Sequence, residues 1–165
     1  MSKSLLIFGC GYVGLELARN AIELGWSVTA FTRNVQTAKK AEQLGASSII
    51  GTLQDSDWWV QVSTDFDHVV NSVGAYSPTI EGYEKSYLLG MQSIVGWMEQ
   101  GKMKAKNLVF TSSSSVYPQT DGSIVDEESE NLGVSARGQI LLQAEKVCLG
   151  VSRNTTDRSS VVRLS

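Results

Sequence analysis

The chain has 165 residues, of which 42% are hydrophobic and 19% are charged, a composition typical of one folded domain and not of a disordered segment. Its net charge of −3 does not favour binding to nucleic acid or to an anionic membrane. Cys10 and Cys148 lack CxxC spacing, so we expect a cytoplasmic protein with free thiols, while a disulfide between them stays open. The apolar run from Leu5 breaks at Gly9 and is too short for a signal sequence or a membrane span.

Taken along the chain, the apolar residues predict strands that alternate with helices. The expected strands cover residues 5–8, 28–32, 48–50, 69–73, 108–111 and 161–164. The expected helices cover residues 13–24, 37–44, 83–100 and 135–149. In the first helix Val13, Leu17, Ala21 and Leu24 share one apolar face, and Gly25 ends it.

This alternation predicts one fold class. Strand–helix–strand units with right-handed crossovers build a parallel sheet with helices on both faces. Nearly continuous apolar strands fit burial on both sides. We therefore predict an α/β protein, a doubly wound parallel sheet of the Rossmann type, over residues 1–165. The acidic loop 118–134 is long enough to suggest a function, although a solvated connection is the simpler interpretation.

A glycine motif, GCGYVG, follows the first strand and opens the first helix. Its spacing predicts a dinucleotide site: Gly9 allows a tight turn, Gly11 lets the backbone approach a pyrophosphate, and Gly14 lets helix and strand pack closely. Tyr12 and Val13 then begin the helix whose N-terminus faces the phosphates. A glycine-rich turn without a ligand remains the alternative.

The end of the second strand bears on cofactor choice. An NAD site usually places an acid there for the ribose 2′-hydroxyl, but this sequence has Arg33, followed by Asn34. A guanidinium pairs with a 2′-phosphate that a carboxylate would repel. We therefore expect Arg33 and Asn34 to contact the cofactor and NADP(H) to be favoured over NAD(H), with NAD as the alternative.

The serine run TSSSSVYP (residues 111–118) follows the fifth predicted strand, where doubly wound sheets bind ligands. With LLIFGCGYVG, VVNSVGA and VVRLS in the same order, it resembles the extended short-chain dehydrogenases/reductases, the epimerase/dehydratase group. The resemblance implies that Ser113 is the catalytic hydroxyl, with Tyr117 a weaker candidate. It also implies cofactor contacts from Leu53, Ser72, Val73 and Gly74.

One departure concerns the catalytic pair of that family, whose pattern is Tyr-x-x-x-Lys-x-x-x-Glu. Anchored on Glu145, the pattern places Arg137 at the tyrosine position and Leu141 at the lysine position. Neither side chain can act as the family's acid–base pair near neutral pH. The chain thus resembles the atypical members that lack this pair. Thr52 also replaces the aspartate of the family's Gly-Asp-Leu, while Leu53 is retained.

Further expectations concern partners. By the resemblance we expect residues 1–165 to form the NAD(P)-binding domain without the family's C-terminal substrate domain. The expected substrate is an unknown small molecule, for which the resemblance suggests a nucleotide sugar. We expect a homodimer through helix 83–100, with Tyr87, Met91 and Trp97 left exposed. His68, at the start of a strand, is expected to be structural, and no spacing indicates a metal site.

Two functions stay open from the sequence. The first is an NAD(P)-binding oxidoreductase or sugar-nucleotide-modifying protein. The second is a non-catalytic dinucleotide-binding or redox-sensing module, or a truncated relic. An unrelated Rossmann domain such as a methyltransferase is disfavoured by the complete glycine motif together with Arg33.

Overall fold

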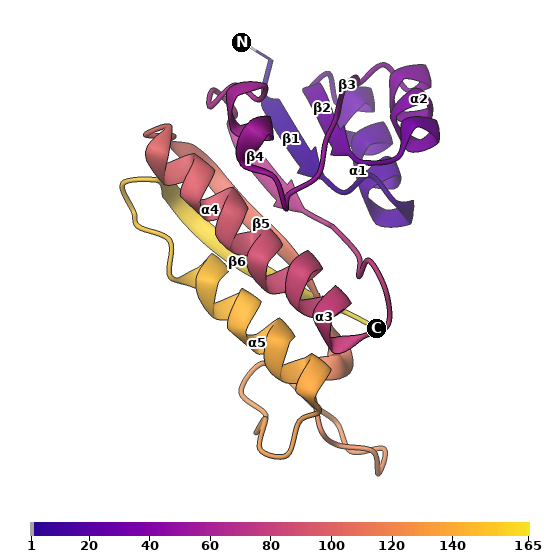
Figure 1. The fold of residues 1–165 in the computed structure, drawn as a ribbon, viewed down its shortest axis with the longest axis vertical. Helices are drawn as coiled ribbons and strands as arrows, with labels where there is room; N and C mark the ends of the chain where they lie inside the picture. The colour runs from indigo at the N-terminus through magenta and orange to yellow at the C-terminus, as the bar shows by residue number, and fades with distance from the viewer. Residues whose placement is uncertain (1) are drawn as a thin grey trace.

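The computed structural model describes residues 2–165 (Figure 1). Six strands are formed by β1 (Ser4–Phe8), β2 (Ser27–Thr32), β3 (Ser47–Ile50), β4 (His68–Asn71), β5 (Ala105–Ser113) and β6 (Thr156–Leu164). The α-helices are α1 (Tyr12–Glu23), α2 (Val35–Gln43), α3 (Ile80–Tyr83), α4 (Gly90–Gln100) and α5 (Ala136–Leu149). Short 3₁₀ turns occur at η1 (Ser56–Val60) and η3 (Ser114–Val116), and a π-helical segment, η2 (Glu84–Leu89), joins α3 to α4.

The strands form one parallel sheet in the order β3-β2-β1-β4-β5-β6. The chain moves outward from β1 to β3, then returns to the other side of β1 with β4. The direction of winding therefore reverses between β1 and β4, and ligands of such sheets bind beyond the carboxyl ends of the strands at this point. The predicted doubly wound parallel fold is confirmed.

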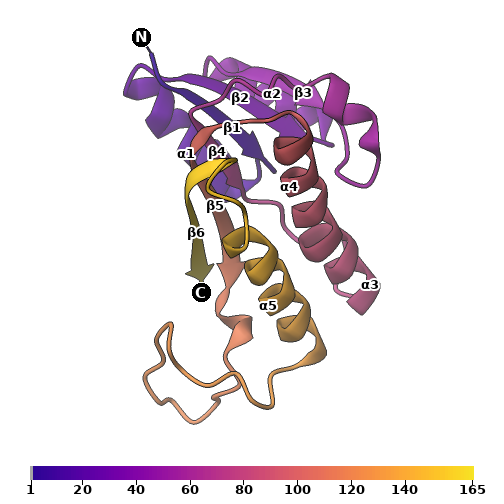
Figure 2. The ribbon, with the colours of Figure 1, turned by 90° about the vertical axis from the view of Figure 1, so that its left-hand side faces the viewer.

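Helices cover both faces of the sheet, with α1 and α2 on one side and α4 and α5 on the other (Figures 1 and 2). Alternation along β1 explains the two layers, because successive side chains of a strand point to opposite faces. Leu6 and Phe8 belong to the apolar cluster beneath α4 and α5, whereas Leu5 and Ile7 belong to the cluster beneath α1 and α2. Burial on both sides accounts for the uninterrupted apolar run.

The predicted apolar face of α1 is confirmed for Leu17 and Ala21 and wrong for Val13 and Leu24. Leu24 is 73% exposed and Val13 is also exposed, while the buried side chains are Ala18 and Ala21, with Gly14 beside them. Small residues face the sheet because α1 packs closely on it. The larger Leu17 is only partly buried at the edge of this contact, and Val13 and Leu24 lie toward solvent.

The expected exposure of helix 83–100 is also corrected. Met91 and Trp97 are buried in the core beneath α4, and Tyr87 is partly buried against the same cluster. The helix uses its apolar stripe to cover the sheet. The homodimer stays a prediction, but it would have to use other side chains, such as the exposed Leu89.

Loop 118–134 extends away from the body of the molecule (Figures 1 and 2). Ile124 and Leu132 are exposed on it. Within residues 2–165 no helix combines the length and the apolar character needed to cross a membrane.

Candidate functional site

The glycine loop sits where β1 ends, beside the ends of β2 and β4. Gly9 has a φ of 81°, and a Cβ placed on it would lie 2.6 Å from the Cα of Val73. A Cβ on Gly14 would collide with the carbonyl oxygen of Gly9. These two glycines are therefore required by the fold of the chain itself.

Gly11 differs from both of them. No heavy atom of residues 2–165 outside its immediate chain neighbours lies within 4 Å of a Cβ built on Gly11, and its φ of −71° is open to any residue. The folded chain therefore does not require a glycine there. A glycine that faces open space at the N-terminus of a helix leaves room for a ligand to approach the backbone N–H groups.

One polar residue after β4 holds the glycine loop, and another shapes the segment beside it. Ser72 Oγ donates a hydrogen bond to the Gly9 carbonyl oxygen at 2.6 Å. Asn71 Oδ1 accepts from the N–H of Val73 at 3.2 Å, within the fully buried end of the strand. The side chain of Ser72 is thus occupied by the chain, and any cofactor contact from this segment would use its backbone.

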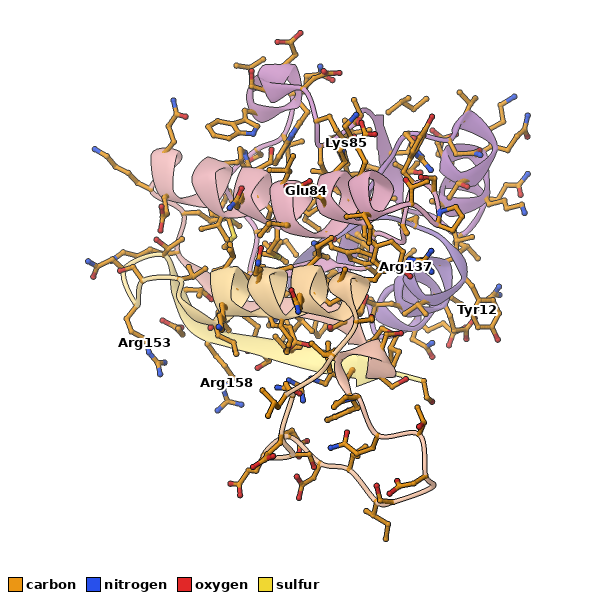
Figure 3. The ribbon with its side chains drawn as sticks, turned by 60° about the horizontal axis from the view of Figure 1, so that its bottom comes forward. Tyr12, Glu84, Lys85, Arg137, Arg153 and Arg158 are labelled. Carbon is orange, nitrogen blue, oxygen red and sulfur yellow. The ribbon has the colours of Figure 1, made fainter. Side chains whose placement is uncertain are left out.

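A cavity of about 650 Å³ opens above the glycine loop. Most of the predicted cofactor residues line it: Gly9, Gly11, Arg33, Asn34, Leu53, Ser72, Val73 and Gly74. Gly14 is buried beneath the loop, while Tyr12 and Val13 point outward from the start of α1 and do not line the cavity (Figure 3 labels Tyr12). That these residues bind a dinucleotide stays a prediction.

The charges on the cavity wall are positive. Among the described residues that line the cavity there is no aspartate or glutamate, and the charged side chains are Arg33 and Lys85. The ammonium of Lys85 pairs with Glu81 at 2.7 Å, whereas Arg33 forms no ion pair within residues 2–165. Cys10 also lines the wall, and burial raises the pKa of its thiol to about 12, so it adds no charge near neutral pH.

The start of α2 lies beside Arg33. Asn34 is its N-cap, and its side-chain oxygen accepts from the N–H groups of Gln36 and Thr37 at 2.8 and 3.0 Å. An amide at this position stabilises the first turn because it satisfies N–H groups that have no helical partner. The cap of α2 therefore uses the side chain that the sequence assigned to cofactor binding.

The serine run forms the end of β5 and the turn η3. Ser113 Oγ accepts from the N–H of Ser115 at 3.2 Å and lies 3.0 Å from Ser115 Oγ. Ser112 is buried, and its hydroxyl has no hydrogen-bond partner within residues 2–165. Ser113 is only partly buried and lies at the carboxyl edge of the sheet, two strands from the glycine loop, but it does not line the cavity.

Tyr117 belongs to a buried polar network at the same end of the sheet. Arg163 on β6 donates to both carboxylate oxygens of Glu145 on α5, at 3.1 and 2.8 Å, and to the Tyr117 hydroxyl at 2.9 Å. Its guanidinium also stacks 5.0 Å from the centre of the Tyr117 ring. The Glu145 carboxylate raises the pKa of Arg163 above its ordinary value. The phenol is thus fixed in a structural network.

Residues 5–137 match the model of the NAD dependent epimerase/dehydratase family. The chain belongs to this family. The resemblance expected from the glycine and serine motifs is confirmed.

Individual relatives share the fold at low identity. A Synechocystis sp. (strain ATCC 27184 / PCC 6803 / Kazusa) protein named "Putative dihydroflavonol 4-reductase" is 26% identical over 126 residues, which are 74% of this chain and 36% of that protein. A UDP-Glc/GlcNAc 4-epimerase of Campylobacter jejuni superposes with a TM-score of 0.79 at 18% identity, over 92% of this chain and 49% of that one. A Bacillus cereus UDP-glucuronic acid 4-epimerase in complex with NAD gives 0.76 at 17%, over 98% and 56%.

This chain thus spans about half the length of those two family structures and 36% of the curated relative. The activity and substrates of a whole relative therefore do not transfer to it directly. At these identities the structural likeness establishes the fold.

The two residues that the sequence places at the positions of the family's catalytic pair lie on α5. Arg137 lies in the first turn of α5, exposed, with its guanidinium 5.4 Å from the ring centre of Tyr83 (Figure 3). Leu141, one turn later, is fully buried in the core. Neither side chain replaces the tyrosine or the lysine chemically.

The lining residues that were not found from the sequence include Tyr76, Lys85 and Ser86. Tyr76 lies in the loop after β4, and the other two lie in the π-helical segment η2. No motif marks them, because their place on the wall depends on how the loop folds back along the helix. His68, by contrast, lies at the amino end of β4, where it stacks on Trp26 at 4.8 Å, in line with its expected structural role.

Proposed function

We propose that this chain is the dinucleotide-binding part of an oxidoreductase or sugar-nucleotide-modifying protein and that it prefers NADP(H). The observation that carries the proposal is the positive cavity wall, where Arg33 stands at the end of β2 without an ion pair within residues 2–165. Open space at Gly11 supports a phosphate approach at the same wall. Family membership supports a nicotinamide dinucleotide as the ligand.

The preference has an electrostatic cause. A 2′-phosphate adds negative charge and three acceptor oxygens, and a guanidinium meets such a group with parallel N–H donors. The N-terminus of α2, beside Arg33, adds a favourable dipole for an anion. A 2′-hydroxyl gains little from either feature, since no carboxylate among the described lining residues is available to accept a hydrogen bond from it.

Replacing Arg33 by alanine tests this proposal. We expect the wild-type chain to bind NADPH more tightly than NADH, and Arg33→Ala to lose about 1–3 kcal/mol of that difference, the value of a charge-assisted hydrogen bond. Calorimetric titration with both cofactors measures the difference. Arg158→Ala removes the same charge from an exposed position on β6, toward the opposite end of the molecule (Figure 3), and should change neither affinity. Equal wild-type affinities for NADPH and NADH would refute the preference.

A non-catalytic dinucleotide-binding or redox-sensing module is the second candidate. Arg137 and Leu141 favour it, because the exposed guanidinium stacks on Tyr83 and the aliphatic side chain is buried in the core. The phenol of Tyr117 is held by Arg163. The tyrosine and the lysine of the family's pattern thus have no chemical equivalent at positions 137 and 141.

Turnover separates the two candidates. We expect this chain to oxidise NADPH very slowly on a panel of keto-sugars and aldehydes, because general acid–base catalysis contributes about 10²–10⁴-fold and lacks its donor here. Cofactor consumption is followed optically, with Ser113→Ala as the matched variant. Steady turnover that Ser113→Ala abolishes would show that another group supplies the proton and would favour the enzyme.

A further inference from the structure

Two exposed side chains meet across the mouth of the cavity. The Arg33 guanidinium carbon lies 4.7 Å from the centre of the Tyr76 ring. Arg33 follows β2 and Tyr76 follows β4, and β1, which carries the glycine loop, lies between these strands. Both residues line the cavity. The stacked pair therefore bridges the two sides of the glycine loop.

The loop that carries Tyr76 is anchored from below. The Tyr76 N–H donates to Ser86 Oγ at 2.8 Å, and Ser86 is buried in the π-helical segment. The ring itself is 67% exposed. Core packing therefore does not account for its position, and the one aromatic or cationic contact that the described residues give it is the stack on Arg33.

The stack leaves the N–H groups of the Arg33 guanidinium free. A cation–π contact uses the face of the guanidinium, whereas hydrogen bonds to a phosphate use the N–H groups on its edge. Within residues 2–165 the arginine side chains that donate hydrogen bonds are those of Arg19, Arg153 and Arg163. Arg33 is thus held by its face, with its edge donors uncommitted.

We propose that Tyr76 is a specificity-determining positioning residue, which holds Arg33 ready for the 2′-phosphate of the dinucleotide. This inference rests on the proposed NADP(H) preference. A free arginine side chain must lose rotational freedom when it binds a phosphate, and a stacked one has already lost part of it. Tyr76 therefore affects the binding free energy of the 2′-phosphate, which only NADPH carries. It does not affect the binding of the part that NADPH and NADH share.

The test compares Tyr76→Leu with Tyr76→Phe. Ordering one long side chain changes affinity by roughly threefold to tenfold, so Tyr76→Leu should lower the NADPH/NADH affinity ratio by that factor through NADPH alone. Tyr76→Phe keeps the ring and should keep the ratio. Adenosine 2′,5′-bisphosphate and 5′-AMP, which differ only in the 2′-phosphate, should reproduce the effect without nicotinamide. Because the ring is exposed, circular dichroism and melting should show both variants folded.

A double-variant cycle completes the experiment. In an Arg33→Ala background, Tyr76→Leu should have no further effect on the ratio, because the cation that it positions is gone. An equal loss of affinity for NADPH and NADH would mean that Tyr76 contacts the shared part of the ligand and would overturn the inference. If the wild type prefers NADPH and Tyr76→Leu keeps that preference, the inference about Tyr76 is overturned while the proposed function stands. A wild type without any preference would overturn the proposed function and the inference together.

Discussion

Replacing Gly11 by valine is expected to abolish dinucleotide binding and to leave the fold intact. The site is open in the folded chain, so the free energy of unfolding should change by about 0.5 kcal/mol or less, as for other surface substitutions. A branched side chain there would block the approach of a pyrophosphate to the helix N-terminus. Losing two charge-assisted hydrogen bonds of about 1.5–3 kcal/mol each weakens binding at least a hundredfold. Titration with NADPH and urea unfolding measure both quantities.

Gly14→Val is the matched control in the same loop. Its side chain would collide with the Gly9 carbonyl oxygen, so we expect a loss of about 1–3 kcal/mol in the free energy of unfolding as well as weaker binding. Only Gly11→Val should separate binding from stability. If Gly11→Val binds NADPH as the wild type does, the phosphate site lies elsewhere.

Replacing Arg163 by alanine is expected to lower the free energy of unfolding strongly, although the arginine side chain is partly exposed. Glu145 is 4% exposed, and Arg163→Ala would leave its carboxylate buried without a partner. Breaking a buried ion pair from one side costs about 3–5 kcal/mol, because the remaining charge stays desolvated. Urea unfolding followed by tryptophan fluorescence gives the free energy directly.

Two further variants identify the cause of that loss. Glu145→Leu with Arg163→Met removes both charges together and should recover most of the stability, since a matched apolar pair carries no desolvation penalty. Tyr117→Phe removes one hydrogen bond and should cost about 1 kcal/mol. If the urea midpoint of Arg163→Ala equals that of the wild type, the network contributes nothing to stability.

The fold could be predicted because its signals are local. Leu5–Phe8 is apolar without a break, and the glycines of GCGYVG stand at a strand–helix junction, so both features can be recognised in a short window. The parallel sheet with helices on both faces follows from the alternation of elements and the handedness of their crossovers, whereas the strand order comes from the structure. Arg33 could be placed on the wall because it directly follows β2.

What could not be predicted depends on contacts between distant segments. Leu24 follows the apolar period of α1, yet only three-dimensional packing shows that the small face at Ala18 and Ala21 lies against the sheet. Tyr76 reaches the cavity because Ser86 holds its loop, a contact over ten residues. Arg163 and Glu145 stand on different elements, and no spacing rule connects them.

The π-helical segment η2 between α3 and α4 also determines where this sequence tolerates the loss of a residue. A π-helical segment accommodates one more residue than the α-helical path over the same distance, and such segments are often found at functional sites. Deleting a single residue within Glu84–Leu89 would let α-helical pitch run from Ile80 to Gln100. Because the π-helical segment absorbs the extra residue, the flanking α3 and α4 would keep their facing, and the change in position would fall on the residues of the segment itself. Ser86 lies in this segment and would leave its place beneath Tyr76, so a deletion distant in sequence from the glycine loop would release one wall of the cavity.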